Sequence, residues 1–319
     1  MAEEPSKINL KEIDMEELEE RLGIVIREAT RAKILMTIIQ LKNTVESSEI
    51  QANLAKGVLD YVAAAGALAF ACKEMDDGNI SMLLKAAGID IRQDMLTVVK
   101  NLHYKNYNLY LNAIYSLESL KIDPTIDMLT RVLRAIDESP DAIVAGYAIE
   151  YYKEFSAGRM HTEKPPLPNV LSMVYDKSYE VTISLYDILA RFGLAEMDKI
   201  LKSEKIRNYK GSDLLPYISA IGMLSFSGKE VDKGSIKRVV LAYGFEINDL
   251  ILSAIGEVHV RNHEVYIIGL YFLNAANKDP TIENVIDVVR AFGVEPDISV
   301  AEYAMNFYKI KDLTEGLDK

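Results

Sequence analysis

The sequence has little of what stabilises small secreted domains or hairpin-rich sheets. Its 319 residues include one cysteine, nine prolines, 17 glycines and no tryptophan. Because Cys72 has no second cysteine to pair with, an internal disulfide framework is excluded. The low proline and glycine content also leaves few of the tight turns that closely spaced β-hairpins require. Hydrophobic residues nevertheless make up 49% of the chain, which is enough to bury a large core.

Positive charge is also scarce. Lysine and arginine number 36 against 48 aspartates and glutamates, which gives a net charge of −12. A chain this acidic is a poor general binder of phosphate backbones, because no long-range attraction steers it toward them. Basic proteins remain suitable partners, and a local basic patch can still contact nucleic acid.

No segment predicts export or insertion into a membrane. The apolar run at residues 62–72 is too short to span a bilayer. The first residues, Met-Ala-Glu-Glu-Pro-Ser-Lys, lack the apolar core of a secretory signal. We therefore expect a cytoplasmic protein without a membrane partner.

The clearest positive feature is an internal duplication with an offset of 156 residues. Residues 110–153 match residues 266–309 at 18 of 44 positions, including an Asp-Pro-Thr segment that starts at Asp123 and at Asp279. At the same offset, residues 61–91 match residues 217–247 at 13 of 31 positions. An ungapped match of this length indicates two related halves.

A weaker repeat of 49 residues divides each half again, since Tyr61 and Leu68 align with Tyr110 and Leu117. The pattern predicts four repeats, at residues 57–106, 107–157, 213–262 and 263–311. A lead-in segment precedes each pair of repeats, at residues 10–56 and 169–212, and a linker at residues 158–168 separates the halves. The predicted domains are therefore residues 1–157 and residues 169–319, the latter with a tail at residues 312–319.

Each repeat has the apolar spacing of helices rather than of strands. Tyr61, Ala64 and Leu68 recur at spacings of three and four, as on one face of a helix. Asp123 and Pro124 have the residue types of a helix N-cap and first helical position. The predicted fold class is all-α, with four three-helix repeats in two fused pairs, each preceded by a long lead-in helix. Because a 50-residue unit buries too little surface to be stable alone, we expect the two repeats of each half to pack together.

The repeats resemble the N-terminal dimerisation domain of the acidic stalk proteins of archaeal and eukaryotic ribosomes. The likeness rests on Tyr-x-x-Ala-x-x-x-Leu at Tyr61 and Tyr110, on Leu-x-Ala-x-Gly at Leu84, and on the acidic turn at Gly293. In that family two such domains dimerise and clasp a helix of an anchoring protein, so the resemblance implies that the lead-in helix occupies the equivalent groove. The family's alanine-rich hinge and acidic tail are not in this sequence, so recruitment of translation GTPases is not implied. In overall plan the chain is also similar to archaeal ribosome-dimerisation factors, which act in hibernation by joining small subunits.

No set of residues in the sequence is typical of catalysis. It contains neither of the two common glycine-rich phosphate-binding motifs, Gly-x-x-x-x-Gly-Lys-Ser/Thr and Gly-x-Gly-x-x-Gly. His259 and His263 are spaced to share a metal on one helix face, but no third ligand follows at the expected spacing. His103 and His259 occupy equivalent positions of the duplication, which favours a structural or surface role. We therefore expect no catalytic residue, metal, cofactor or small-molecule substrate.

One candidate for partner contact is the basic segment at residues 202–210, because basic residues beside a tyrosine are typical of an RNA contact. Aromatic side chains near helix ends are the other candidate. The predicted partner surface comprises Lys202, Lys205, Arg207, Tyr209, Lys210, His103, His259, Tyr152 and Tyr308. With the resemblance, these residues favour a ribosome-associated protein that bridges or occupies subunits, in hibernation or translational control. Its partners would be basic ribosomal proteins and rRNA. A helical adaptor unrelated to translation and an enzyme with a site between the halves remain alternatives, and a homodimer stays open.

Overall fold

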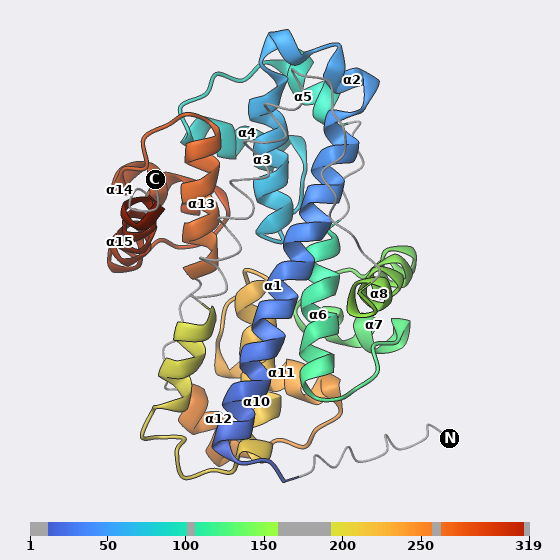
Figure 1. The fold of residues 1–319 in the computed structure, drawn as a ribbon, viewed down its shortest axis with the longest axis vertical. Helices are drawn as coiled ribbons and strands as arrows, with labels where there is room; N and C mark the ends of the chain where they lie inside the picture. The colour runs from blue at the N-terminus through green and yellow to red at the C-terminus, as the bar shows by residue number, and fades with distance from the viewer. Residues whose placement is uncertain (1–11, 101–105, 159–192, 257–262, 316–319) are drawn as a thin grey trace. The chain divides into compact units, whose positions relative to one another are not determined.

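The computed structural model describes residues 12–100, 106–158, 193–256 and 263–315. These residues form helices, turns and loops, and no β-strand (Figure 1). The predicted all-α class is therefore confirmed for the described part of the chain. None of the helices in that part is both long enough and apolar enough to cross a membrane.

The predicted lead-in helix is present as α1 (Met15–Val45). Asp14 accepts a hydrogen bond from the backbone N–H of Glu17 at 2.8 Å, and Glu16 and Glu17 lie in the first turn, where negative charge favours the helix dipole. Two short helices follow, α2 (Ser48–Gln51) and η1 (Leu54–Lys56).

Six further helices follow in each half of the chain's repeat region, and the second set matches the first. The first set is α3 (Val58–Phe70), α4 (Asp77–Ala86), α5 (Gln93–Lys100), α6 (Tyr107–Ser119), α7 (Ile126–Ala135) and α8 (Ala142–Ser156). The second set is α10 (Gly211–Phe226), α11 (Lys233–Tyr243), α12 (Asp249–Gly256), α13 (His263–Ala275), α14 (Ile282–Ala291) and α15 (Ile298–Glu315). Helices α12, α13 and α14 begin and end 156 residues after α5, α6 and α7, so the sequence offset is also an offset of helix boundaries.

The turns between these helices share one backbone conformation. A left-handed residue follows the first helix of each set of three, at Cys72, Lys121, Gly228 and Asn277. Another follows the second helix, at Gly88, Asp137, Gly244 and Gly293. The residue that follows each left-handed residue after a first helix donates its backbone N–H to a carbonyl five positions earlier. That carbonyl belongs to a buried leucine in all four cases, as when Lys73 donates to Leu68 at 2.8 Å. These bonds satisfy carbonyls that the helix ends would otherwise leave open.

The predicted capping role of Asp123 is wrong. Helix α7 is capped by Thr125, whose hydroxyl accepts from the backbone N–H of Met128, and α14 is capped by Thr281 in the same way. Thr125 has the extended backbone of a cap and reaches the third amide of the helix, whereas Asp123 lies two residues too early. Asp141 does cap α8, accepting from the backbone N–H groups of Ile143 and Val144.

The helices form two compact units, which we call unit 1 and unit 2. Unit 1 comprises the described parts of Met1–Ala32, Leu109–Met160 and Ala190–Asn262. Unit 2 comprises those of Lys33–Asn108, His161–Leu189 and His263–Lys319. Each unit therefore contains helices from both halves of the sequence, which differs from the predicted domains at residues 1–157 and 169–319.

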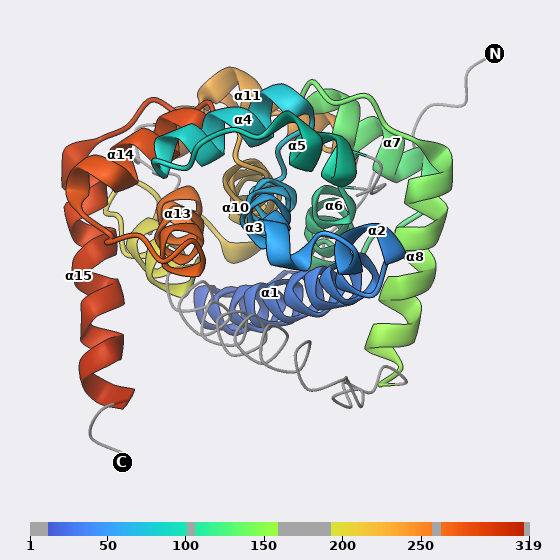
Figure 2. The same cartoon turned by 90° about the horizontal axis from the view of Figure 1, so that it is seen from above.

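In unit 1, α7 packs against α8 and α11, and α10 packs against α11 and α12. The views in Figures 1 and 2 place α7 and α8 on one side of α6. Arg238 of α11 donates to the carbonyl of Ala135 at 3.0 Å and pairs with Asp137 at 3.1 Å, so it binds the C-terminal end of α7. The buried hydroxyls of Ser119 and Ser219 lie 2.6 Å apart and join α6 to α10.

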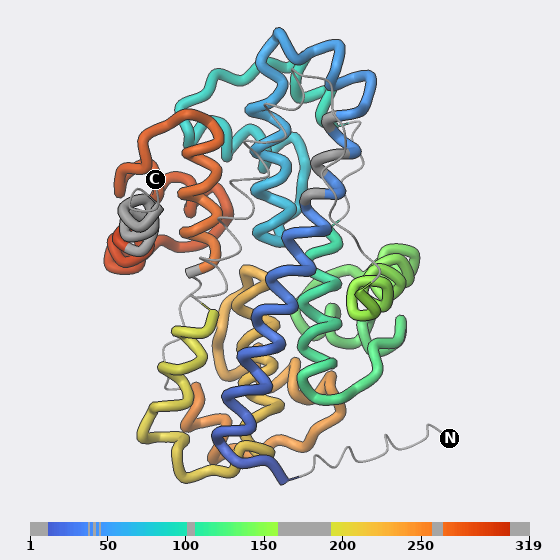
Figure 3. Tube along the Cα trace, viewed as in Figure 1, coloured from blue at the N-terminus to red at the C-terminus, as the bar shows by residue number. Residues whose placement is uncertain are grey.

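In unit 2, α13 packs against α3, α14 and α15, and α4 packs against α3 and α14. The path of the chain through these helices can be followed in Figure 3. Helices α3 and α4 thus pack with α13 and α14, and in unit 1 α7 packs with α11. The expected pairing within each half therefore differs from the observed units, and the duplication explains why the sequence does not decide between them. Equivalent segments carry equivalent apolar faces, so the sequence pattern does not say which copy is the neighbour.

Candidate interaction surfaces

The predicted basic segment lies in unit 1, in the loop that precedes α10. The side chains of Lys202, Lys205, Arg207 and Lys210 are exposed, and Tyr209 is half-buried. Lys202 pairs with Asp198 at 2.7 Å, Arg207 with Glu204 at 4.0 Å, and Lys210 with Glu12.

These ion pairs change what the segment offers to a partner. Lys202, Arg207 and Lys210 each face a carboxylate, so the positive charge of the segment is locally balanced rather than concentrated. Exposed pairs of this kind contribute little to stability, about 0–1 kcal/mol each, and a competing phosphate can replace the carboxylate only at some cost. An RNA contact at this segment stays a prediction.

Three other predicted residues cannot be placed. His103 and His259 lie outside the described residues. Tyr308 belongs to α15, but its side chain lies outside the described part.

Tyr152 is half-buried on α8 in unit 1 and belongs to a cluster of acidic and aromatic side chains. Its ring contacts the ring of Tyr115 on α6 edge to face, with centroids 5.5 Å apart and planes at 90°. Its hydroxyl donates a hydrogen bond to the carboxylate of Glu118, also on α6. Glu28 of α1 faces the same cluster and acts electrostatically on Tyr115 and Glu118.

Burial and like charge shift the acidities in this cluster. Burial raises the pKa of Glu118, the hydrogen bond from Tyr152 lowers it, and Glu28 raises it further. Burial and then the charge of Glu118 raise the pKa of Tyr152 to about 12. Burial and the charges of Glu118 and Glu28 also raise the pKa of Tyr115. Within the cluster, burial and like charge therefore both disfavour ionisation of Glu118 and of the two tyrosines.

Sequence reasoning missed a set of exposed apolar side chains on α7 and α8. Ile143 is 84% exposed and Tyr147 is 46% exposed, and their spacing of four residues places them on one face of α8. Ile126, the first residue of α7, is also exposed. Scattered exposed apolar residues are common on proteins, so a repeated arrangement says more than any single residue.

The arrangement is repeated in part in unit 2, where two of the three positions recur and Ser299 stands at the position equivalent to Ile143. Tyr303 on α15 is 48% exposed and lies 156 positions after Tyr147, and Ile282 on α14 is exposed at the position equivalent to Ile126. Ile298, at the start of α15, is 63% exposed. The identity of Tyr147 and Tyr303 was visible in the sequence, but a tyrosine on a helix is more often buried, and only the structure places both outside.

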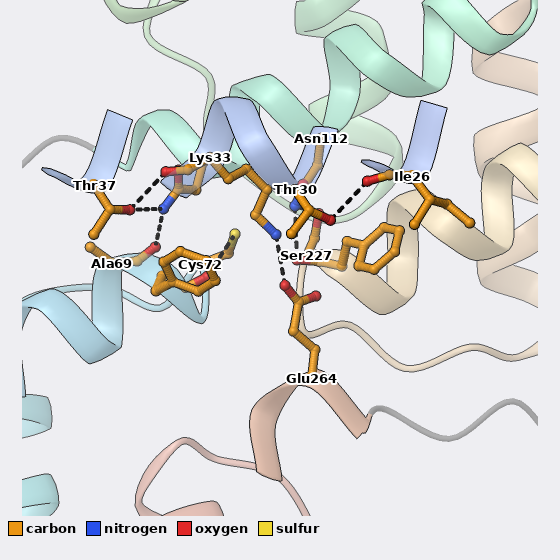
Figure 4. Close-up of polar contacts among 12 residues, drawn as sticks. Ile26, Thr30, Lys33, Thr37, Ala69, Cys72, Asn112, Ser227 and Glu264 are labelled. Carbon is orange, nitrogen blue, oxygen red and sulfur yellow. Dashed lines mark hydrogen bonds and ion pairs between the residues drawn. The ribbon is translucent and has the colours of Figure 1, made fainter. Parts of the chain in front are cut away.

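A buried ion pair lies in unit 2. Lys33 of α1 and Glu264 of α13 are 2.8 Å apart, with side chains 3% and 8% exposed (Figure 4). The ammonium group also lies 5.3 Å from the centre of the Phe70 ring. Nearby, the hydroxyl of Thr37 donates to the carbonyl of Lys33 at 2.9 Å and accepts from the side-chain amide of Asn108 at 3.2 Å. Because burial of charge is costly, such a pair fixes which helices are neighbours more than it adds stability.

Among the described residues, no group of three or more histidine, cysteine or acidic side chains is placed to hold a metal ion. Comparison with known proteins adds no relative: no protein-family model, no curated protein and no solved structure matches the chain. The proposals that follow therefore depend on the geometry described above and on the resemblance of the repeats.

Proposed function

We propose that the protein is a non-enzymatic, bivalent binding protein made of four three-helix repeats, and that it binds ribosomal subunits. The repeats would comprise α3–α5, α6–α8, α10–α12 and α13–α15. Binding at two equivalent surfaces lets one chain bridge two sites or two particles.

A hydrogen bond found four times supports the repeats. The hydroxyls of Tyr61, Tyr110, Tyr217 and Tyr266 each accept from the backbone N–H of the residue 31 positions later, at 2.6–2.7 Å. Each bond joins the first helix of a repeat to the turn before its third helix. Together with the shared left-handed turns, it indicates four copies of one local structure.

The observation that carries bivalency is the duplicated exposed surface. Unit 1 presents Ile126, Ile143 and Tyr147, and unit 2 presents Ile282, Ile298 and Tyr303. Tyrosine is enriched at the buried centres of protein interfaces, and apolar neighbours help to exclude water around it. One such group in each unit gives two related contact sites.

The ribosomal partner is supported by resemblance and by charge. The repeats resemble the dimerisation domain of ribosomal stalk proteins, and the overall plan resembles archaeal factors that join small subunits. The net charge of −12 suits contact with basic ribosomal proteins. Tyr147 and Tyr303 then serve as the apolar anchors of that contact.

The test is sedimentation of purified small and large subunits with the full-length protein through sucrose gradients at low and high salt. Co-sedimentation is expected at low salt and should weaken at high salt, because the Debye length falls from about 10 Å at 0.1 M to about 3 Å at 1 M. Bridging would appear as a faster-sedimenting subunit dimer.

Variants distinguish binding of one ribosomal subunit from bridging of two subunits. Tyr147→Ser and Tyr303→Ser should each keep binding but abolish the dimer, and the double variant should lose both. Leu250→Ser serves as the control, since it removes an exposed apolar side chain of α12 in unit 1 that belongs to neither group. If the protein stays at the top of the gradient with both subunits at low salt, the ribosomal proposal fails and an adaptor role takes its place.

A further inference from the structure

The acidic and aromatic cluster of unit 1 holds two carboxylates, those of Glu118 and Glu28, and both side chains are half-buried. Among the described residues, neither forms an ion pair with a lysine or arginine. Burial and the nearby charge of Glu28 both raise the pKa of Glu118, so the ionised form of Glu118 is penalised.

The cluster also holds an unused buried hydroxyl. Tyr115 is buried, and its hydroxyl has no hydrogen-bond partner in the described part of the chain. Leaving such a group unpaired costs about 1–3 kcal/mol, so its retention beside two carboxylates points to a ligand that can donate hydrogen bonds. The perpendicular rings of Tyr115 and Tyr152 add aromatic surface, which attracts cations.

We propose that Glu28, Tyr115, Glu118 and Tyr152 form a binding site for an organic cation, namely a primary ammonium or a guanidinium group. Such a group donates to both carboxylates and to the tyrosine oxygens, and its charge removes their repulsion. A calcium or magnesium ion fits less well, because it requires about six or more oxygen ligands in a closed arrangement. This inference goes beyond the proposed function and does not rest on it.

The second half lacks one of the two carboxylates at the equivalent positions. At the equivalent positions of the second half, Tyr271 and Tyr308 replace Tyr115 and Tyr152, but Asn274 stands in place of Glu118. An amide lacks the charge that attracts a cation, so one ligand per chain is expected. The cation can be a free polyamine or a lysine or arginine side chain of a partner, and the probes below distinguish these sources.

The experiment is isothermal titration of the full-length protein at neutral pH and low salt with three probes. Spermidine and agmatine represent free amines, and N-acetyl-arginine methylamide represents a partner's side chain. The expected result is binding of one equivalent of at least one probe, with sodium and magnesium chloride at matched ionic strength giving no comparable heat. Tighter binding of the blocked arginine assigns the site to a partner's side chain, and tighter binding of the free amines assigns it to a small molecule.

The double variant Glu28→Gln/Glu118→Gln should weaken binding at least about tenfold, because it removes two charge-assisted contacts. Glu150→Gln/Glu154→Gln is the matched control, since it makes the same change in net charge at two exposed positions of α8 in the same unit. Tyr152→Phe removes only the hydroxyl that binds Glu118 and should weaken binding less. Circular dichroism checks that each variant is folded. Equal loss in the control, or no binding of any probe to the folded wild type, overturns the proposal.

Discussion

Units 1 and 2 contain equivalent helices with similar apolar faces, but the buried polar contacts of the two units differ. In unit 1 these contacts are neutral: Ser119 bonds Ser219, and the side-chain amide of Asn112 donates to the carbonyl of Phe226 at 2.8 Å. In unit 2 the equivalents of the two serines are Ala275 and Ala63, and the main polar contact is the ion pair of Lys33 and Glu264. After duplication the apolar pattern persisted while the polar contacts diverged. The two units should therefore respond differently to pH and to single substitutions.

The largest effect is expected at the apolar positions that the units share. Leu117 in unit 1 and Leu273 in unit 2 are equivalent and fully buried. Changing either to aspartate buries an unpaired carboxylate, which costs several kcal/mol, roughly the stability of a small domain. Leu117→Asp should unfold α6–α8 and α10–α12 and spare α13–α15, and Leu273→Asp should do the reverse. Hydrogen exchange followed by peptide mass spectrometry measures this, and loss of protection in the wrong set of helices would contradict the unit boundaries.

The next largest effect separates the units. Lys33→Met leaves Glu264 buried without its cation and should lower the free energy of unfolding by about 3–5 kcal/mol. Lys33→Met/Glu264→Leu should recover most of this loss, because it removes both charges. Denaturant unfolding at neutral pH compares the three proteins.

The loss in Lys33→Met should also depend on pH. Burial raises the pKa of Glu264 above its ordinary 4.5, and Lys33 opposes that shift, so removing Lys33 raises the pKa further. A carboxyl group with a raised pKa binds its proton more tightly in the folded state, so stability falls as pH rises from the unfolded-state pKa through the folded-state pKa. The stability difference from wild type should be larger at pH 8 than at pH 5. A difference independent of pH would show that Glu264 is not the residue left unpaired.

A smaller effect should be equal in both units. Tyr110→Phe removes the acceptor for the backbone N–H of Asp141, and Tyr266→Phe removes the one for Asp297. Each should cost about 1–2 kcal/mol, the range for a net hydrogen bond and a partly exposed unpaired donor. Clearly unequal losses in denaturant unfolding would count against a shared repeat structure.

A still smaller effect tests the divergence directly. Ser119→Ala leaves Ser219 without its side-chain partner and should cost about 1 kcal/mol. Ser119→Ala/Ser219→Ala reproduces the alanines of unit 2 and should be nearly neutral, because both polar groups are removed. A double-mutant cycle in urea measures the coupling, and additive losses would show that the two hydroxyls do not depend on each other.

Cleavage of the chain between its two halves should leave the size of the folded protein unchanged. A protease site inserted after Gly158, at the end of the first half, should be cleaved without separating the fragments, because each unit contains helices from both sides of the cut. Size-exclusion chromatography of the cleaved protein should show one species of unchanged size. Two separate species would restore the predicted domains at residues 1–157 and 169–319.

Local structure was predicted well because its signals are local. The three-and-four spacing of apolar residues predicted helices, and the lead-in segment at residues 10–56 contains the long helix α1. The cap at Thr125 was missed because several residues before α7 have capping side chains, and backbone geometry selects among them. Of the predicted partner surface, Tyr152 lies in a cluster of acidic and aromatic side chains. The positive charge of the basic segment is balanced by neighbouring carboxylates. The exposed Tyr147 and Tyr303 were not predicted, since exposure depends on which helices cover a face.

The sequence by itself determined the helical class and the duplication, because the first follows from residues close together in the chain and the second from direct identity at a fixed offset. Only the tertiary structure decided which segments are neighbours. The equivalent faces of α3 and α10 offer similar apolar surfaces, so hydrophobic burial alone does not discriminate between them. Directional contacts do: Arg238 binds the end of α7, and Lys33 requires Glu264, which lies 231 residues away in the sequence. Charges and hydrogen bonds have specific partners, and those partners become visible only when the chain is folded.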